Sequence, residues 1–95
     1  MAKAAREGDL GTGHGGFPPR QCIQGSPDVT INGKAAHRTN DAWAVHVLGN
    51  SAHDSTMGQG SGTVTVNGMP LARVGDPVNC GSTVMLGSPD VEVGG

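Results

Sequence analysis

The sequence predicts an all-β fold, a small cone or three-sided prism of short strands with three-fold pseudo-symmetry and no long helix. Two observations support this prediction. Residues 25–41 and 60–76 are two copies of one stretch, and in each copy apolar and polar residues alternate with the period of two that is typical of strands. A third copy is split, since residues 87–93 begin it and residues 2–9 finish it. Because the split copy is complete only where the termini meet, we expect a closed ring of three units.

Each copy begins with a Gly-Ser turn that leads into a strand, and the apolar residues of that strand are expected to share one face. These residues are Val29 and Ile31, Val64 and Val66, and Val91 and Val93. An Asn-Gly pair follows at 32–33 and at 67–68, which is the strongest short signal for a hairpin because both residues tolerate positive φ. The second strand of each hairpin is then expected to run to Arg38 or Arg73.

Helices of useful length are not expected anywhere in the chain. Its 17 glycines and 6 prolines are spread along the whole sequence and interrupt helical patterns. The best helical candidate, residues 41–48, carries the β-branched Val45 and Val47 at strand spacing. We therefore predict a strand there as well.

The composition indicates a thin core. Leu, Ile, Val and Phe together number 17 of 95 residues (ten Val, four Leu, two Ile and one Phe), below the roughly 20% at which folding without help becomes difficult. Small domains of this kind commonly need a staple such as a metal ion. A net charge of −2 and the regular repeat argue against disorder. The near-neutral balance, with Phe17 and Trp43 as the aromatic residues, excludes nucleic acid as a partner.

The sequence predicts one domain over residues 1–95 without an extension. The first residues lack the apolar region of a signal peptide, and no stretch approaches the roughly 18 apolar residues of a membrane span, so we expect synthesis in the cytoplasm without a signal peptide. In that setting Cys22 and Cys80 are expected to serve as a core residue or a ligand, with a disulfide as the minor alternative. Cys22 precedes Ile23 and is interpreted as a core residue, although it could also substitute as a metal ligand.

Residues with nitrogen or sulfur donors follow the last Asp of each copy at nearly the same spacing. His14 and His46 lie five residues after that Asp, and Cys80 lies four residues after it. In a three-sided closure these places converge on the axis, and His53 in the longest connector is the expected fourth donor. Imidazole and thiolate donors in a tetrahedral set suit Zn²⁺, with iron as the alternative. The predicted metal ligands are His14, His46, His53 and Cys80.

Other polar and core residues are given structural roles. His37 is left out of the ligand set because Ala5 and Ala72 occupy its strand slot in the other copies. Each repeat also has an Arg three residues before its last Asp, and we interpret these pairs as turn-capping contacts or surface ion pairs. Trp43 and the methionines are interpreted as fillers of a thin core. The sequence contains no His-Glu-x-x-His and no activated serine motif, so we do not expect an enzyme.

The stretch Gly60-Ser-Gly-Thr-Val-Thr-Val-Asn-Gly-Met-Pro-Leu-Ala-Arg-Val-Gly-Asp76 resembles the proline-alanine-alanine-arginine repeat of PAAR proteins. The resemblance implies a small cone with a zinc ion near its point, held by three histidines and one cysteine at the positions named above. It also implies a base that sits on the trimeric β-helical spike of a type VI secretion system, a contractile phage tail or a related machine. The other copy ends in Arg38-Thr-Asn40-Asp41 instead of Arg-x-Gly-Asp, and Asn is a tolerated substitute for Gly at positive φ.

Two functions follow as hypotheses. The first is a metal-stabilised tip that caps a trimeric spike, VgrG-like or from a phage tail, and helps to puncture the target envelope. Such a tip would be monomeric by itself, bind one per trimer, contact the target membrane only transiently, and be delivered outside the producing cell at the end of a tube or virion. The alternative is a small zinc hydrolase, in which three histidines hold the metal and Cys80 stays free.

Overall fold

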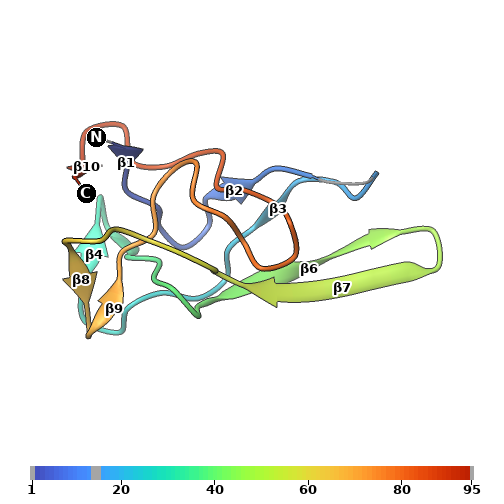
Figure 1. Ribbon diagram of the computed structural model, residues 1–95, viewed down its shortest axis with the longest axis horizontal. Helices are drawn as coiled ribbons and strands as arrows, with labels where there is room; N and C mark the ends of the chain where they lie inside the picture. Colours follow the sequence, from blue (N-terminus) through green and yellow to red (C-terminus); the bar gives the residue numbers. More distant parts are fainter. Residues whose placement is uncertain (1, 14–15, 95) are drawn as a thin grey trace.

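The computed structural model describes residues 2–13 and 16–94, and at position 53 it describes the backbone alone. These residues form short strands and no helix, as expected for an all-β chain (Figure 1). In chain order the strands are β1 (Ala2–Lys3), β2 (Leu10–Gly11), β3 (Arg20–Gln21), β4 (Thr30–Ile31), β5 (Lys34–Ala35), β6 (Ala42–Leu48), β7 (Ser51–Thr56), β8 (Thr65–Val66), β9 (Met69–Pro70) and β10 (Glu92–Val93). No helix that could cross a membrane occurs among the described residues.

The strands pair antiparallel in twos. The pairs are β1 with β10, β2 with β3, β4 with β5, β6 with β7, and β8 with β9. The turns of β4–β5 and β8–β9 are the predicted Asn-Gly pairs, with φ of 56° at Asn32, 78° at Gly33, 53° at Asn67 and 78° at Gly68. Positive φ at both central residues matches the twist of the flanking strands, so the predicted hairpin turns are confirmed. The second strands end at Ala35 and Pro70 and do not run to Arg38 and Arg73 as expected, because the chain beyond them forms isolated bridges with other repeats.

The split third copy is closed by the termini. Ala2 of β1 lies opposite Val93 of β10, and Lys3 lies opposite Glu92. Figure 1 shows the two ends of the chain close together at the end of the molecule that also carries β4, β8 and β9. The prediction that the termini complete one repeat together is therefore confirmed.

Three backbone hydrogen bonds join the repeats in a closed circuit, which we call the axial ring. The amide of Ala5 donates to the carbonyl of Ala72 at 2.9 Å, the amide of Ala72 to His37 at 3.0 Å, and the amide of His37 to Ala5 at 3.1 Å. Each of these three residues thus donates a hydrogen bond from its amide to one of the other two repeats and accepts one at its carbonyl from the remaining repeat. The axial ring is what three-fold pseudo-symmetry requires, although the symmetry itself stays a prediction.

Each repeat ends in a turn that an Arg–Asp pair closes. In the first of them, Asp41 accepts from the backbone amide of Arg38 at 2.9 Å and from the guanidinium at 2.8 Å through each carboxylate oxygen. The Arg6–Asp9 and Arg73–Asp76 pairs repeat this pattern. Of the two interpretations of these pairs, turn capping is confirmed, since each Asp accepts from the backbone amide of its Arg. The pairs are not at the surface: the exposures of Arg and Asp are 9% and 6% in the pair at 6 and 9, 8% and 3% in the pair at 38 and 41, and 20% and 12% in the pair at 73 and 76.

The residue before the Asp in each of these turns has positive φ. The values are 95° at Gly8, 76° at Asn40 and 94° at Gly75. Asn adopts this left-handed conformation more readily than most other residues that carry a side chain. The Asn at position 40 therefore keeps the turn that glycine forms in the other two repeats.

The core is divided into two small clusters. One contains Trp43, Met57 and Cys22 together with small and branched residues, and the other contains Val66, Leu71 and Val93 with two alanines. The filler role of Trp43 and Met57 is confirmed, whereas Met85 is 40% exposed. The prediction for the strand valines is wrong in part. The second apolar residue of each pair packs in or against the core, but the first, at positions 29, 64 and 91, is 36–38% exposed.

Hairpin β6–β7 is the longest element and extends away from the end that holds the termini (Figure 1). The strand predicted over residues 41–48 is confirmed by β6. Its register is irregular between Trp43 and His46, so that Trp43 can point into the core while the outer half of the hairpin continues as a ribbon. The molecule measures 38 × 24 × 22 Å, with β6–β7 along its longest dimension (Figure 1).

Candidate metal centre

The outer half of β6–β7 brings two of the predicted ligand positions together. The Cα atoms of His46 on β6 and His53 on β7 are direct partners in the ladder. The side chain of His46 is buried, with 3% exposure, on a strand whose neighbours Val45 and Val47 are exposed. The alternation of the strand therefore directs His46 inward, toward the segment that contains Pro18 and Phe17.

The imidazole of His46 is fixed by a backbone carbonyl. Its Nδ1 lies 2.9 Å from the carbonyl oxygen of Pro18, and the ring of Phe17 packs against it at 4.8 Å between centroids. Since a carbonyl can only accept, Nδ1 is the donor in this contact, which leaves the lone pair of a neutral imidazole on Nε2. Metal-binding histidines are commonly held in this way, with one ring nitrogen donating to a carbonyl and the other facing the metal.

Cys80 lies beside the same hairpin in a positively charged environment. Arg20 donates from Nη2 to the Cys80 Sγ at 2.7 Å and from Nη1 to the Ala44 carbonyl at 2.9 Å. Burial by itself would raise the pKa of Cys80, but hydrogen bonds with Ser82, the charge of Arg20 and the hydroxyl of Ser55 outweigh it, so the pKa of this thiol is lowered. The thiolate that metal binding requires is therefore favoured at this position.

The distance between Cys80 and the histidine pair can be followed along β7. Ser55, which interacts with Cys80, lies two residues after His53, a separation of about 7 Å along a strand. The backbone of Asn79 donates to the carbonyl of Thr56 at 3.0 Å, which fixes the loop around Cys80 to the end of β7. Three of the four predicted positions are thus carried by one hairpin and the loop bonded to it.

The fourth position, His14, and the side chain of His53 lie outside the described residues. Among the side chains that the structure describes, no group of three or more His, Cys, Asp or Glu gathers as a metal site. His46 and Cys80 are the two predicted ligands whose side chains are described. Each is held by a hydrogen bond of the kind that orients metal ligands, His46 by a backbone carbonyl and Cys80 by the guanidinium of Arg20. The complete set of His14, His46, His53 and Cys80 stays a prediction.

Cys22 is suited to the core and not to a metal. It is 1% exposed, and its thiol donates to the carbonyl of Arg6 at 2.9 Å. Burial raises the pKa of Cys22 to about 12, which holds the sulfur in its neutral form. Both Cys22 and Cys80 are free thiols, so the structure has no disulfide between them.

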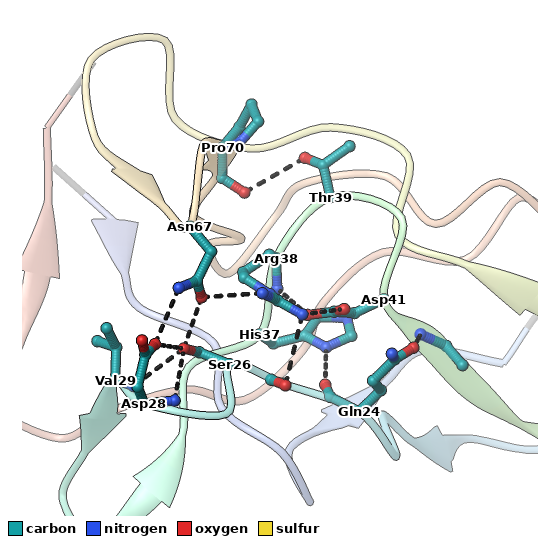
Figure 2. A network of polar contacts seen from close by, with 12 residues as sticks. Gln24, Ser26, Asp28, Val29, His37, Arg38, Thr39, Asp41, Asn67 and Pro70 are labelled. Carbon is teal, nitrogen blue, oxygen red and sulfur yellow. Dashed lines mark hydrogen bonds and ion pairs between the residues drawn. The ribbon is translucent and has the colours of Figure 1, made fainter.

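A network of polar contacts between repeats was not predicted from the sequence (Figure 2). Asn67, in the turn of β8–β9, reaches the first repeat, where its Oδ1 accepts from Ser26 at 2.6 Å and from Arg38 at 2.9 Å. Its Nδ2 donates to Asp28 at 2.8 Å. The hydroxyl oxygen of Ser26 accepts from the backbone of Asp28 and Val29, which shapes the turn before β4.

The first repeat makes the same contacts with the third. Asn32 accepts from Ser88 at 2.6 Å and from Arg6 at 3.1 Å, and it donates to Asp90 at 2.8 Å. The sequence signal for this network was the recurrence of Gly-Ser and Asn-Gly, which we had interpreted only as turns. The serines are buried, with 5% exposure at Ser26 and 0% at Ser88.

Fold and site together define a closed ring of short β-repeats that carries two candidate metal ligands on and beside its longest hairpin. The chain matches the PAAR motif over residues 11–86. A curated relative, the double-stranded DNA deaminase toxin A of Burkholderia cenocepacia (strain H111), is 39% identical over 71 residues, which cover 72% of this chain and 5% of that toxin.

The chain belongs to the PAAR family. Membership implies a role of the spike-tip type in a secretion or injection machine, with delivery outside the cell. The chain spans about 5% of the length of the curated relative, so the deaminase activity in that protein's name is a property of the toxin and is not transferred to this chain.

Proposed function

We propose that this protein is a metal-stabilised, non-enzymatic tip that caps a trimeric β-helical spike and helps to puncture the target envelope. The observation that supports it best is the closure of the three repeats, by the pairing of β1 with β10 and by the axial ring. A single chain with three similar sides can offer much the same contacts to each subunit of a trimer, so one tip suffices for three spike chains. It also covers strand edges that the end of a β-helix would otherwise expose.

The base of the tip is proposed to be the end that holds the termini. β4, β8 and β10 lie there, and each follows an exposed valine at an equivalent position (Figure 1). The exposures are 38% at Val29, 38% at Val64 and 36% at Val91. Three apolar side chains of nearly equal exposure suit a partner that presents three equivalent subunits.

The opposite end is proposed to be the point and to hold the metal. His14, His46, His53 and Cys80 would be its ligands, and three imidazoles with one thiolate suit Zn²⁺ better than a hard cation. A structural zinc ion contributes roughly 10 kcal/mol or more to folding in small peptides at neutral pH. Such a contribution would hold together the end of the molecule that has few core side chains.

Association with a spike is tested by mixing the protein with a trimeric β-helical spike protein and measuring the mass of the product by light scattering. We expect one tip per three spike chains. Val64→Asp at the base should abolish the complex, because a carboxylate would be buried in the contact. The matched control is Val47→Asp, since Val47 is 54% exposed on the outer half of β6 and should not affect binding. Loss of the complex in both variants, or no complex with the wild type at micromolar concentration, would reject the proposal.

The metal is tested separately by mass spectrometry of the purified protein and by Co²⁺ substitution. A charge-transfer band from thiolate to Co²⁺ that Cys80→Ser removes would support the closed set of four ligands. A metal-loaded protein without that band, in which Cys80→Ser has no effect on the spectrum, would support the zinc hydrolase with three histidines and an open position.

A further inference from the structure

His37 occupies an exceptional place on the axial ring. Its side chain is fully buried, while the equivalent residues of the other two repeats are the small Ala5 and Ala72. Its backbone takes part in two of the three bonds of the axial ring, one to Ala5 and one from Ala72. The imidazole therefore lies where the other repeats place only a methyl group, next to the bonds that close the ring.

The hydrogen bonds of His37 fix its tautomer. Nδ1 lies 2.7 Å from the carbonyl oxygen of Gln24, and Figure 2 shows the ring directed at that carbonyl. Since the carbonyl can only accept, Nδ1 carries the proton and Nε2 the lone pair. Nε2 is buried and has no hydrogen-bond partner in the part of the chain that the structure describes.

The surroundings of Nε2 are unsuited to a second proton. The ring of Trp43 stands edge-on to the imidazole, with 5.3 Å between centroids, and its Nε1 is likewise buried without a partner among the described residues. An indole nitrogen can only donate, so it cannot accept a hydrogen bond from protonated His37. A proton on Nε2 would therefore be a buried donor with no described acceptor, which costs free energy.

The charged groups around His37 do not compensate for this cost. Burial lowers the pKa of His37, and the positive charge of Arg38 adds to that effect. The carbonyl of Gln24 and the carboxylates of Asp41 and Asp9 act in the opposite direction without outweighing burial. Both carboxylates are already engaged, since Asp41 is bonded to Arg38 and Asp9 is bonded to the arginine of its own turn.

We propose that His37 is an acid-sensitive lock of the axial ring, which stays closed while the imidazole is neutral and opens around the first repeat when Nε2 is protonated. The sign follows from proton linkage. Below the ordinary pKa of about 6.5 the unfolded chain binds a proton at this residue and the folded chain does not, so stability falls as pH falls. The unfolding equilibrium constant then rises by up to about tenfold per pH unit, until the pKa of the folded state is reached.

The test compares wild-type protein and His37→Asn by urea unfolding at about pH 7.5 and about pH 5. The amide of Asn keeps a donor near the position of Nδ1 but does not titrate. On acidification, we expect the unfolding equilibrium constant of the wild type to rise about tenfold more than that of the variant. Equal losses in both proteins would overturn the proposal. Metal content is measured at each pH, because acid release of a metal affects both proteins and cancels in the comparison.

A second measurement covers the case in which His37→Asn does not fold. The ¹⁵N shifts of the His37 ring are followed by NMR while the wild-type protein is titrated with acid. We expect Nδ1 protonated and Nε2 unprotonated throughout the folded range, with the change occurring only as the protein unfolds. A midpoint near about 6.5 in protein that remains folded would overturn the proposal.

Discussion

Replacing Asn67 should destabilise the protein through contacts that lie between repeats. In Asn67→Gly the glycine tolerates the observed φ of 53°, so the turn of β8–β9 survives while the side-chain amide is lost. The amide Oδ1 accepts from buried Arg38 at 2.9 Å and from buried Ser26 at 2.6 Å. At about 1 kcal/mol net for each of these bonds, the free energy of unfolding should fall by about 2 kcal/mol. The bond to Asp28 is left out of this sum, because that carboxylate is exposed to solvent.

Asn67→Ala should be worse than Asn67→Gly by about 1 kcal/mol, because alanine carries a Cβ into a left-handed conformation. Urea unfolding at constant zinc concentration measures both changes, and about 2 kcal/mol corresponds to a shift of roughly 8–16 °C in melting temperature for a domain of this size. Asn32→Gly removes the same contacts from the first repeat and should cost a similar amount. Asn50→Gly is the control, since Asn50 is exposed in the β6–β7 turn and has no hydrogen bond from its side chain to described residues. If Asn67→Gly costs no more than Asn50→Gly, the inter-repeat contacts do not stabilise the fold.

A local readout accompanies the loss of stability. The side-chain amide of Asn67 is the largest cause that lowers the pKa of Asp28, followed by Ser26. Because the folded pKa is depressed, this contact stabilises the fold above the ordinary pKa of about 3.8 and loses its effect as pH falls through the folded value. An NMR titration of the Asp28 carboxyl group should therefore show a higher midpoint in Asn67→Gly than in the wild type. An unchanged midpoint would contradict the assigned contact.

Three further predictions concern the turns, the core and the metal. Asn40→Ala should cost about 1 kcal/mol in urea unfolding because φ is 76°, while Asn40→Gly should cost less; the reverse order would contradict the turn geometry. Trp43→Ala should cost about 3–5 kcal/mol, since the side chain is 1% exposed, and a change under about 1 kcal/mol would show that it does not anchor the core. His46→Ala and Cys80→Ser should lower zinc content and melting temperature together, and full zinc occupancy in either variant would exclude that residue as a ligand.

The elements that were predicted correctly depend on local sequence. The turn at Asn67-Gly68 requires positive φ at consecutive residues, and this requirement is visible in two letters of sequence. The same holds for Asn40, which replaces glycine in one turn and adopts the same conformation. The meeting of the termini was predictable too, because a copy cut in two has a single way to be completed.

The features that were missed depend on how one repeat is rotated against the next. The spacing of Ser26 and Asn67 in the sequence does not reveal that their side chains meet, since they belong to different repeats. The contacts of Arg38 with Asn67 and of Arg6 with Asn32 have the same origin, because the partners belong to different repeats. His37 was left out of the ligand set from the sequence, but for the same reason its full burial beside the axial ring was not predicted.

The arginines explain how a thin core can still specify a single arrangement of the repeats. Arg38 holds Asp41 of its own turn and also donates to Asn67 of the following repeat, and Arg6 does the same with Asp9 and Asn32. A guanidinium that loses its Asn partner is left with an unsatisfied donor, which costs about 1–3 kcal/mol, and this bond forms only in one geometry, whereas an apolar contact has no preferred direction. Wrong registers between repeats are therefore penalised more by the polar contacts than by the few apolar ones. The arginines between the repeats therefore contribute more to selecting one arrangement of the three repeats than to the net free energy of unfolding.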